Sequence, residues 1–363
     1  AERLARPAPF RPEIDHNRYL LAALQHRRAE FLGTDVLNES SGHRLSSRVT
    51  TEKRLVAPRF ATVMVMEKAS NTPFGPVVTA VITPFDSEGG VDYGTFWKLV
   101  RYLLSNGSDS VLVSGTTGES PTLSDAEKIA LYKAAVDAAG DRGMVIAGTG
   151  TYDTRHSVEM SEKAAEVGCH ALMGVVPYYS KPPQEGIKRH FTAMADATDL
   201  PLMMYNIPGR TSRLMAVDTI VELAEHDRIV AVKDAVDDIA YSRRELKAVP
   251  DGFAVYAGSD SMTRDIVEAG GVGVVSVASH LAGPQVRRLV EAAASGDEAV
   301  ARKLHDGLTP LFDALFVEPN PMPLKAGMAK LWADVGQPRL PLVPASEETT
   351  TMVVEAMEGA SKL

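Results

Sequence analysis

A lysine at the end of an apolar run is the residue of this sequence with the clearest chemical potential. The run IVAV at 229–232 leads directly into Lys233 and Asp234, and a charged cluster at 226–228 precedes it. A wholly apolar run of this length predicts a strand that is buried on both faces of a sheet. Lys233 would then lie where the buried strand meets the space above it.

Burial would change the chemistry of this lysine. A lysine in water has a pKa of about 10.4 and is almost wholly protonated at neutral pH. Loss of hydration penalises the ammonium form and lowers the pKa, and a neutral amine can attack a carbonyl carbon to form a Schiff base. A lysine whose ammonium group extends back to water is the alternative interpretation for this residue taken alone.

Polar side chains with complementary chemistry follow other apolar runs. They are Thr116 and Thr117, Tyr178 and Tyr179, Tyr205 and Arg210, and Ser259 and Asp260. If Lys233 forms an imine with a 2-oxo acid, Tyr205 could exchange protons with the intermediates as a general acid and base. The two threonines and nearby backbone amides could hold one carboxylate, and the planar guanidinium of Arg210 could hold a second.

The elements that must position these residues repeat along the chain. Eight short apolar runs predict strands at 77–83, 110–114, 144–147, 171–176, 201–205, 229–233, 254–257 and 274–277. Amphipathic segments between them predict helices at 93–105, 124–139, 154–167, 185–198, 216–225, 239–248, 260–269 and 284–295. Strict alternation predicts an α/β fold with parallel strands, and eight units are the number of a (β/α)8 TIM barrel.

A doubly wound open sheet is the alternative fold. Such a sheet usually carries a glycine-rich phosphate turn after its first strand, whereas Thr83, Pro84 and Phe85 follow the first run here. In a (β/α)8 barrel the active site lies at the carboxyl ends of the strands. The polar side chains above are therefore expected to converge on one site.

Three parts are predicted: an N-terminal extension at 1–66, the barrel at 67–296 and a C-terminal helical domain at 297–363, with helices at 298–316, 323–332 and 346–358. In the extension, 18–31 predicts an amphipathic helix and 38–51 an unstructured segment. An Arg- and Ser-rich leader is typical of transit peptides, but acidic residues intervene here. Translated upstream sequence, with the working start at Met64 or Met66, is the other interpretation. We expect the extension to be dispensable.

Composition excludes several classes of function. Hydrophobic residues make up 45% and charged residues 23%, as in a soluble globular protein. The net charge of −9 argues against nucleic acid or an anionic membrane as partner, and no apolar run is long enough to span a bilayer. The single cysteine, Cys169, fits a reducing compartment, and we expect a cytoplasmic protein. No cofactor or metal site is expected, since the histidines stand singly: His156, His170, His190 and His280.

Five motifs, in this order, resemble the dihydrodipicolinate synthases, a family of the N-acetylneuraminate lyase superfamily of pyruvate-dependent Schiff-base aldolases. The motifs are GTTGES at 115–120, PYY at 177–179 followed by KPPQEG at 181–186, YNIPGR at 205–210, VKD at 232–234 and EPNP at 318–321. The resemblance runs from about Phe74 to the C-terminal helices and leaves the first 66 or so residues uncovered.

The resemblance implies a reaction and a role for each matching residue. Pyruvate and L-aspartate 4-semialdehyde would condense to 4-hydroxy-tetrahydrodipicolinate, toward diaminopimelate and lysine. The implied roles are imine formation for Lys233, proton relay for Tyr205, Thr116 and Tyr179, pyruvate binding for Thr117, binding of the semialdehyde carboxylate for Arg210, and a backbone near the site for Val275. Tyr179 would come from a neighbouring subunit, and most relatives are homotetramers built as dimers of dimers.

Two other functions remain open. A sister aldolase would form the same imine but take a sugar acid, sialic acid or 4-hydroxy-2-oxoglutarate. Arg210 favours the synthase, because a second substrate carboxylate gives that arginine a partner. A non-catalytic relative that binds a 2-oxo acid would be expected to have lost Lys233 or Tyr205, and both are present.

The sequence departs from the lysine-inhibited members of the family in the cleft where they bind lysine. Those relatives often carry His and Glu at positions that align with Lys128 and His156 here. An ammonium group at Lys128 would repel the ammonium groups of the inhibitor. We therefore expect weak or absent inhibition by lysine.

Overall fold

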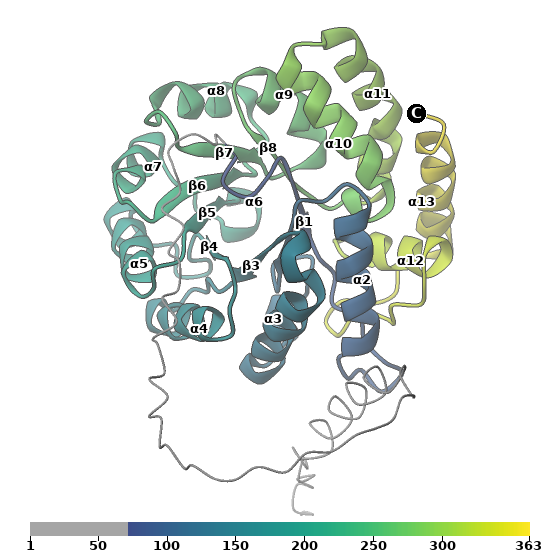
Figure 1. Cartoon of the computed structure of the whole chain (residues 1–363), viewed down its shortest axis with the longest axis horizontal. Helices are drawn as coiled ribbons and strands as arrows, with labels where there is room; N and C mark the ends of the chain where they lie inside the picture. The colour runs from purple at the N-terminus through teal and green to yellow at the C-terminus, as the bar shows by residue number, and fades with distance from the viewer. Residues whose placement is uncertain (1–71) are drawn as a thin grey trace, which may run out of the picture. The chain divides into compact units, whose positions relative to one another are not determined.

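Eight parallel strands pair in chain order and close into a barrel, with β8 beside β1 (Figure 1). The strands are β1 Val77–Ala80, β2 Ser110–Val113, β3 Met144–Gly148, β4 Ala171–Val175, β5 Leu202–Asn206, β6 Ile229–Asp234, β7 Ala254–Ala257 and β8 Gly273–Ser276. This computed structural model describes residues 72–363. The predicted (β/α)8 barrel is confirmed, and the open sheet is excluded because the outer strands pair with each other.

Helices surround the strands, and further helices follow the barrel at the C-terminal end of the chain (Figure 1). Those that follow successive strands are α2 Tyr93–Ser105, α3 Asp125–Ala139, α4 Thr154–Glu166, α5 Gln184–Asp196, α7 Val217–Ala224, α8 Ile239–Ala248, α9 Thr263–Glu268 and α10 Ser279–Ser295. The further elements are the short α6 Pro208–Thr211, the 3-10 turns η1 Ser120–Thr122, η2 Gly140–Arg142 and η3 Asp260–Met262, and the C-terminal helices α11 Glu298–Ala314, α12 Met322–Leu331 and α13 Glu347–Ala360.

Local sequence accounts for where several helices begin. Ser124 and Glu127 form a reciprocal capping box at the start of α3, each side chain bonding the backbone N–H of the other. The predicted helix 260–269 instead opens with the 3-10 turn η3, in which the buried carboxylate of Asp260 accepts from the backbone N–H of Val277. Helix α10 begins five residues earlier than predicted, at Ser279, and is kinked at Ala282, just before Pro284.

Two apolar cores lie on either side of the strands. The outer core packs strands against helices, and the inner core fills the barrel. Because side chains alternate along a strand, Val232 of β6 belongs to the outer core and Ala231 to the inner core. Lys233, two residues after Ala231, therefore points to the interior at the carboxyl end of β6.

The inner core closes the barrel below this lysine. Phe74 precedes β1 and is fully buried in the interior, where its ring centroid lies 6.1 Å from that of Tyr256. Its backbone N–H donates to the hydroxyl of Tyr256, and its carbonyl accepts from Ser110. The amino end of the barrel is thus plugged by packed side chains.

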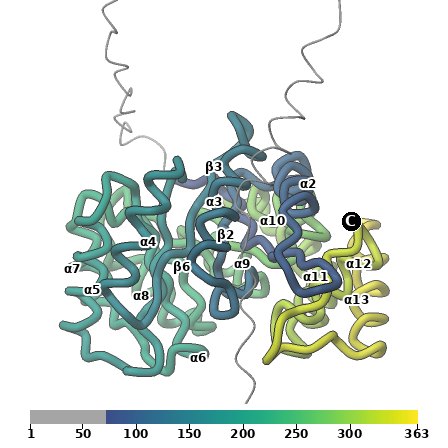
Figure 2. Tube along the Cα trace, turned by 90° about the horizontal axis from the view of Figure 1, so that it is seen from below, coloured from purple at the N-terminus to yellow at the C-terminus, as the bar shows by residue number. Residues whose placement is uncertain are grey.

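The C-terminal helices form one side of the same compact unit as the barrel. Figures 1 and 2 both show α12 and α13 beside α2 and α10, away from α4, α5 and α7. The EPNP turn at 318–321 joins α11 to α12. Among the described residues, no helix is long and apolar enough to cross a membrane. The predictions for 1–66, including the helix at 18–31, the segment at 38–51 and the starts at Met64 or Met66, lie outside the described residues.

Candidate active site

Lys233 and Tyr205 meet at the carboxyl ends of neighbouring strands. The two residues are direct partners in the register of β5 and β6. The amine nitrogen of Lys233 lies 4.2 Å from the centroid of the Tyr205 ring. Only 5% of Lys233 and 4% of Tyr205 are exposed. The structure therefore places an amine against a phenol at the top of the inner core.

The environment of Lys233 favours its neutral form. Burial lowers the pKa of Lys233 to about 7, and the nearby charge of Arg210 acts in the same direction while Asp260 opposes it. A shift of this size corresponds to roughly 5 kcal/mol of preference for the uncharged amine. A substantial fraction of the nucleophilic form is thus present at neutral pH.

Asp260 is a neighbour of Lys233 to which the sequence gave no role. Its carboxylate accepts hydrogen bonds from the hydroxyl of Ser276 and from the backbone N–H groups of Val277 and Ala278, at 2.5, 2.9 and 3.0 Å. Burial raises the pKa of Asp260, whereas these hydrogen bonds and the charge of Lys233 lower it. Three hydrogen bonds hold the Asp260 carboxylate in place, and its negative charge opposes the lowering of the Lys233 pKa.

Tyr205 is a neutral phenol at physiological pH. Burial raises the pKa of Tyr205 to about 12, against the lowering effects of Arg210 and of a hydrogen bond with Thr116. A phenol in this state carries a proton that it can donate and accept back.

A cavity of about 940 Å³ opens above Lys233 and collects most of the predicted site residues. Thr116, Thr117, Tyr205, Lys233 and Arg210 all line it. Its far wall comes from the C-terminal segment, through Phe312, Asp313 and residues 316–320. Residues from β2, β5 and β6 and from the C-terminal segment at 312–320 thus share one site.

Thr117 is anchored by a residue that the sequence did not single out. The side-chain amide of Asn320, in the EPNP turn, donates to the Thr117 hydroxyl at 2.9 Å across 203 residues of chain. Asn320 is itself buried and lines the same cavity. The only sequence signal was the EPNP motif, which carries no information about its contact with Thr117.

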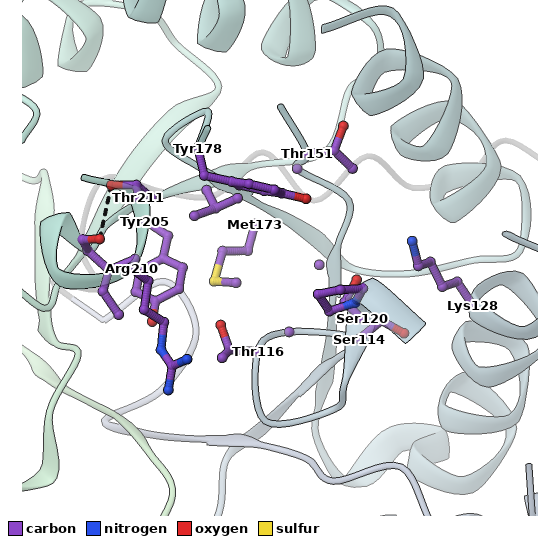
Figure 3. Close-up of a pocket in the computed structure, with 16 residues that line it drawn as sticks. Ser114, Thr116, Ser120, Lys128, Thr151, Met173, Tyr178, Tyr205, Arg210 and Thr211 are labelled. Carbon is purple, nitrogen blue, oxygen red and sulfur yellow. Dashed lines mark hydrogen bonds between the residues drawn. The ribbon is translucent and has the colours of Figure 1, made fainter. Parts of the chain in front are cut away.

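A second, smaller cavity of about 230 Å³, drawn in Figure 3, shares lining residues with the first. Thr116, Tyr205 and Arg210 line both cavities. Figure 3 shows these residues on one side of the small cavity and Lys128 on the other. Tyr178 also lines it, with its ring edge-on to Tyr152 at 5.3 Å between centroids.

Two predicted site residues lie away from the lysine cavity. Tyr179 is 91% exposed, has a left-handed backbone with φ of 67°, and lines a surface recess of about 420 Å³ with Arg210. Val275 lies in the inner core of the barrel, with its side chain buried beneath the cavity that Val277 lines. The structure thus brings five of the seven predicted residues to the wall of the lysine cavity, while Tyr179 lines a separate recess and the side chain of Val275 belongs to the inner core.

The histidines singled out in the sequence make structural contacts. His280 accepts from the backbone N–H of Ile82, and His170 accepts from that of Val145. His190 bonds Thr154, and His156 lies 2.9 Å from the Asp125 carboxylate. Within residues 72–363, no three His, Cys, Asp or Glu side chains form a group that could hold a metal ion.

Comparison with known proteins gives a consistent match over the described part of the chain. The model of the dihydrodipicolinate synthetase family matches residues 73–360. The chain is 48% identical over 277 residues to a 4-hydroxy-tetrahydrodipicolinate synthase of Synechococcus elongatus, covering 76% of this chain and 93% of that protein. It is 46% identical over 274 residues to the enzyme of that name from Bacillus velezensis, covering 76% and 95%.

Solved structures agree with the sequence matches. The dihydrodipicolinate synthase DapA-2 of Bacillus anthracis superposes with a TM-score of 0.77 at 44% identity, covering 78% of this chain and 98% of that one. The dihydrodipicolinate synthase of Cyanidioschyzon merolae, described with lysine bound, gives a TM-score of 0.78 at 42% identity and covers 80% and 99%.

Proposed function

Because the chain belongs to the dihydrodipicolinate synthetase family, we propose that it is a 4-hydroxy-tetrahydrodipicolinate synthase, a lyase of lysine and diaminopimelate biosynthesis. Its substrates are pyruvate and L-aspartate 4-semialdehyde. The observation that carries the proposal is the buried Lys233 amine, with its pKa lowered to about 7, against the phenol of Tyr205 in one cavity.

The first half of the reaction joins pyruvate to the chain. The neutral amine of Lys233 attacks the ketone carbon, and the carbinolamine that forms loses one water to give the imine. Tyr205 donates the proton that this water carries away and recovers one from the attacking nitrogen, with Thr116 relaying it. Thr117 and its backbone hold the pyruvate carboxylate, near the backbone of Val275.

The second half forms the new carbon–carbon bond. The imine loses a methyl proton, and the resulting enamine attacks the aldehyde carbon of the semialdehyde, whose oxygen takes up a proton. The amino group of the second substrate then attacks the imine carbon, closes the ring and releases Lys233. One pyruvate and one semialdehyde give one product and one water. Arg210 at the cavity rim binds the semialdehyde carboxylate.

Tyr179 completes the proton relay from a neighbouring subunit in this proposal. A tyrosine that is 91% exposed, on a backbone with a φ of 67°, is more readily explained by contact with a partner than by solvent. The proposed assembly is a cytoplasmic homotetramer built as a dimer of dimers.

The test of the function is a coupled assay with purified protein. Pyruvate and L-aspartate 4-semialdehyde are supplied, and the product is read through the NADPH oxidation of its reductase. Turnover that requires both substrates is the expected result. A folded protein that traps pyruvate with borohydride but does not turn over the semialdehyde would point instead to a sister aldolase.

Replacing Arg210 with glutamine is expected to weaken binding of the semialdehyde selectively. Charge-assisted hydrogen bonds contribute about 1.5–3 kcal/mol, so KM for the semialdehyde should rise roughly 10- to 100-fold. KM for pyruvate should change much less, because Arg210 is exposed at the rim and affects Lys233 at the floor only through its charge, which lowers the pKa of Lys233 less than burial does. Steady-state kinetics with each substrate varied in turn measure both constants.

A matched control for this prediction is Arg189→Gln. Arg189 is also exposed but pairs with Glu185 on α5, outside the two cavities. It should leave both KM values unchanged. Equal effects on the two substrates in Arg210→Gln would contradict a role in recognising the semialdehyde.

Inhibition by L-lysine is expected to be weak, with no effect below about 1 mM. Lys128 lines the small cavity and its side chain is only 9% exposed, so its ammonium group, which lies 3.9 Å from the more exposed carboxylate of Asp125, would repel the ammonium groups of the ligand. Burial lowers the pKa of Lys128, while Asp125 opposes that shift. A lysine titration of the coupled assay measures the effect.

The double variant Lys128→His, His156→Glu is the informative counterpart. It restores the residue types that lysine-inhibited relatives often carry at these positions and should be inhibited at lower lysine concentrations than the parent. Sub-millimolar inhibition of the parent protein would show that the Lys128 charge does not exclude the ligand.

A further inference from the structure

A buried ion pair joins the C-terminal helix α12 to the loop that carries Thr116 and Thr117. Nζ of Lys325, on α12, lies 2.6 Å from Oε1 of Glu119, and the two side chains are 2% and 1% exposed. Burying two charges is costly, and an apolar pair of similar volume often stabilises a fold as well or better. A contribution to stability alone therefore does not explain why two charged residues occupy these buried positions.

Further contacts fix the Glu119 carboxylate from the same segment. Its other oxygen accepts from the backbone N–H of Arg339 at 2.8 Å. The guanidinium of Arg339 bonds the Glu127 carboxylate and the carbonyl oxygens of Gly89 and Thr122. Lys325 Nζ also lies 4.0 Å from the centroid of the Phe85 ring. The two oxygens of the carboxylate are thus held by Lys325 on α12 and by Arg339 in the segment between α12 and α13.

The backbone at Glu119 determines the shape of the threonine loop. Glu119 has a left-handed φ of 56°, its N–H donates to the carbonyl of Thr116, and the N–H of Ser120 donates to that of Gly115. A non-glycine residue holds this conformation only where its surroundings enforce it. Because its contacts fix the position of the Glu119 side chain, they also fix the backbone of the turn that presents Thr116 and Thr117 to the cavity.

We propose that Lys325 and Glu119 are positioning residues for the reaction, which hold the Thr116–Thr117 loop in the geometry that the pyruvate carboxylate requires. Neither residue lines the cavity of Lys233, so both act through the loop. The inference rests on the proposed function, in which this loop binds pyruvate. Asn320, which bonds Thr117 from the same C-terminal segment, adds a second attachment.

The test is a kinetic comparison in which the two substrates are separated. Lys325→Met removes the ammonium group and keeps the length of the side chain. KM for pyruvate is expected to rise roughly tenfold, since small displacements of positioning groups are costly, while KM for the semialdehyde stays within about twofold. Glu119→Gln keeps the shape and one acceptor for the Arg339 N–H, so it should give a smaller rise in the same direction.

Met328→Ala is the matched control, since Met328 is fully buried on the same helix. It should lower the melting temperature but leave KM for pyruvate unchanged. The proposal is overturned if folded Lys325→Met and Glu119→Gln keep the parent KM for pyruvate, or if Met328→Ala raises it equally. If Lys325→Met does not fold, Glu119→Gln alone decides.

Failure of the proposed function would be visible separately in the parent protein. A parent without turnover of the two substrates would refute the synthase assignment. The positioning role would then be measured by the pyruvate concentration that gives half-maximal borohydride trapping on Lys233. An increase in that concentration for Lys325→Met over the parent supports the role, and equal values overturn it.

Discussion

Lys233→Ala should abolish turnover, with a loss on the order of 10³-fold or more, because no other described residue that lines the Lys233 cavity carries a side-chain amine that could form the imine in its place. Borohydride reduction in the presence of pyruvate should add the mass of a reduced pyruvate adduct to the parent protein and not to the variant. The coupled assay and intact-protein mass spectrometry measure the two results. Retained turnover in the variant would exclude Lys233 as the nucleophile.

The variant Lys233→Met distinguishes loss of the nucleophile from loss of the folded structure. It keeps an unbranched side chain in the buried position, so it should be as inactive as Lys233→Ala while remaining folded. The unfolded chain binds a proton at Lys233 more tightly than the folded chain, whose pKa is lowered from 10.5 to about 7. The variant should therefore unfold at a higher denaturant concentration than the parent near pH 7, because the cost of burying an ammonium group is gone.

The same shift predicts the pH dependence of the parent. The nucleophile is the neutral amine, so the rate of adduct formation with pyruvate should fall as the pH drops through about 7. Above that pH it should level off, since the amine is then mostly deprotonated. A midpoint near 10, the range of a lysine in water, would contradict the buried environment of Lys233.

Tyr205→Phe is the change with the second largest expected effect. It removes only the hydroxyl, and general acid–base catalysis typically contributes 10²- to 10⁴-fold, so kcat should fall by about that factor. The imine with pyruvate should still form, because Lys233 is unchanged. It should form slowly, because the phenol that transfers the protons is missing. Single-turnover trapping and steady-state kcat measure the two steps.

Tyr256→Phe provides the control for a lost phenol. Tyr256 is equally buried in the same barrel, but its hydroxyl accepts from the backbone of Phe74 at the closed end. Loss of that hydrogen bond should cost about 1 kcal/mol of stability and little activity. If both variants lose kcat alike, the effect of Tyr205→Phe reflects packing rather than proton transfer.

The repeating pattern of the sequence was sufficient to predict the barrel. Apolar runs and amphipathic segments alternate along the chain because each strand is covered by the helix that follows it. Strand ends were less predictable: the run at 77–83 continues three residues beyond β1. Val81, Ile82 and Thr83 stay buried although they leave the strand, so burial alone does not mark where pairing stops. Helix α6, four residues long, is too short to show a helical period.

The location of the candidate site could be predicted for those residues that lie at or just after the ends of strands. Lys233, Tyr205, Thr116, Thr117 and Arg210 each follow or end an apolar run, and the closed barrel brings them together. The contacts that hold them were not predictable. Asn320 reaches Thr117, and Lys325 reaches Glu119, from the far end of the chain. No local pattern reports such pairs, because they depend on how the C-terminal helices pack against the barrel.

The packed side chains around Phe74 close the amino end of the barrel, so the Lys233 cavity is reached from the carboxyl end of the strands. In the proposed reaction pyruvate, the expelled water, the semialdehyde and the cyclic product all pass the same rim, beside Arg210 and the EPNP turn. The three carbons of pyruvate would lie deepest, bonded to Lys233, so pyruvate must enter before the semialdehyde, and its carbons leave together with those of the semialdehyde as one product. In the proposed reaction the order of substrate binding therefore follows from the depth of Lys233 in the cavity and from the imine that must form there first.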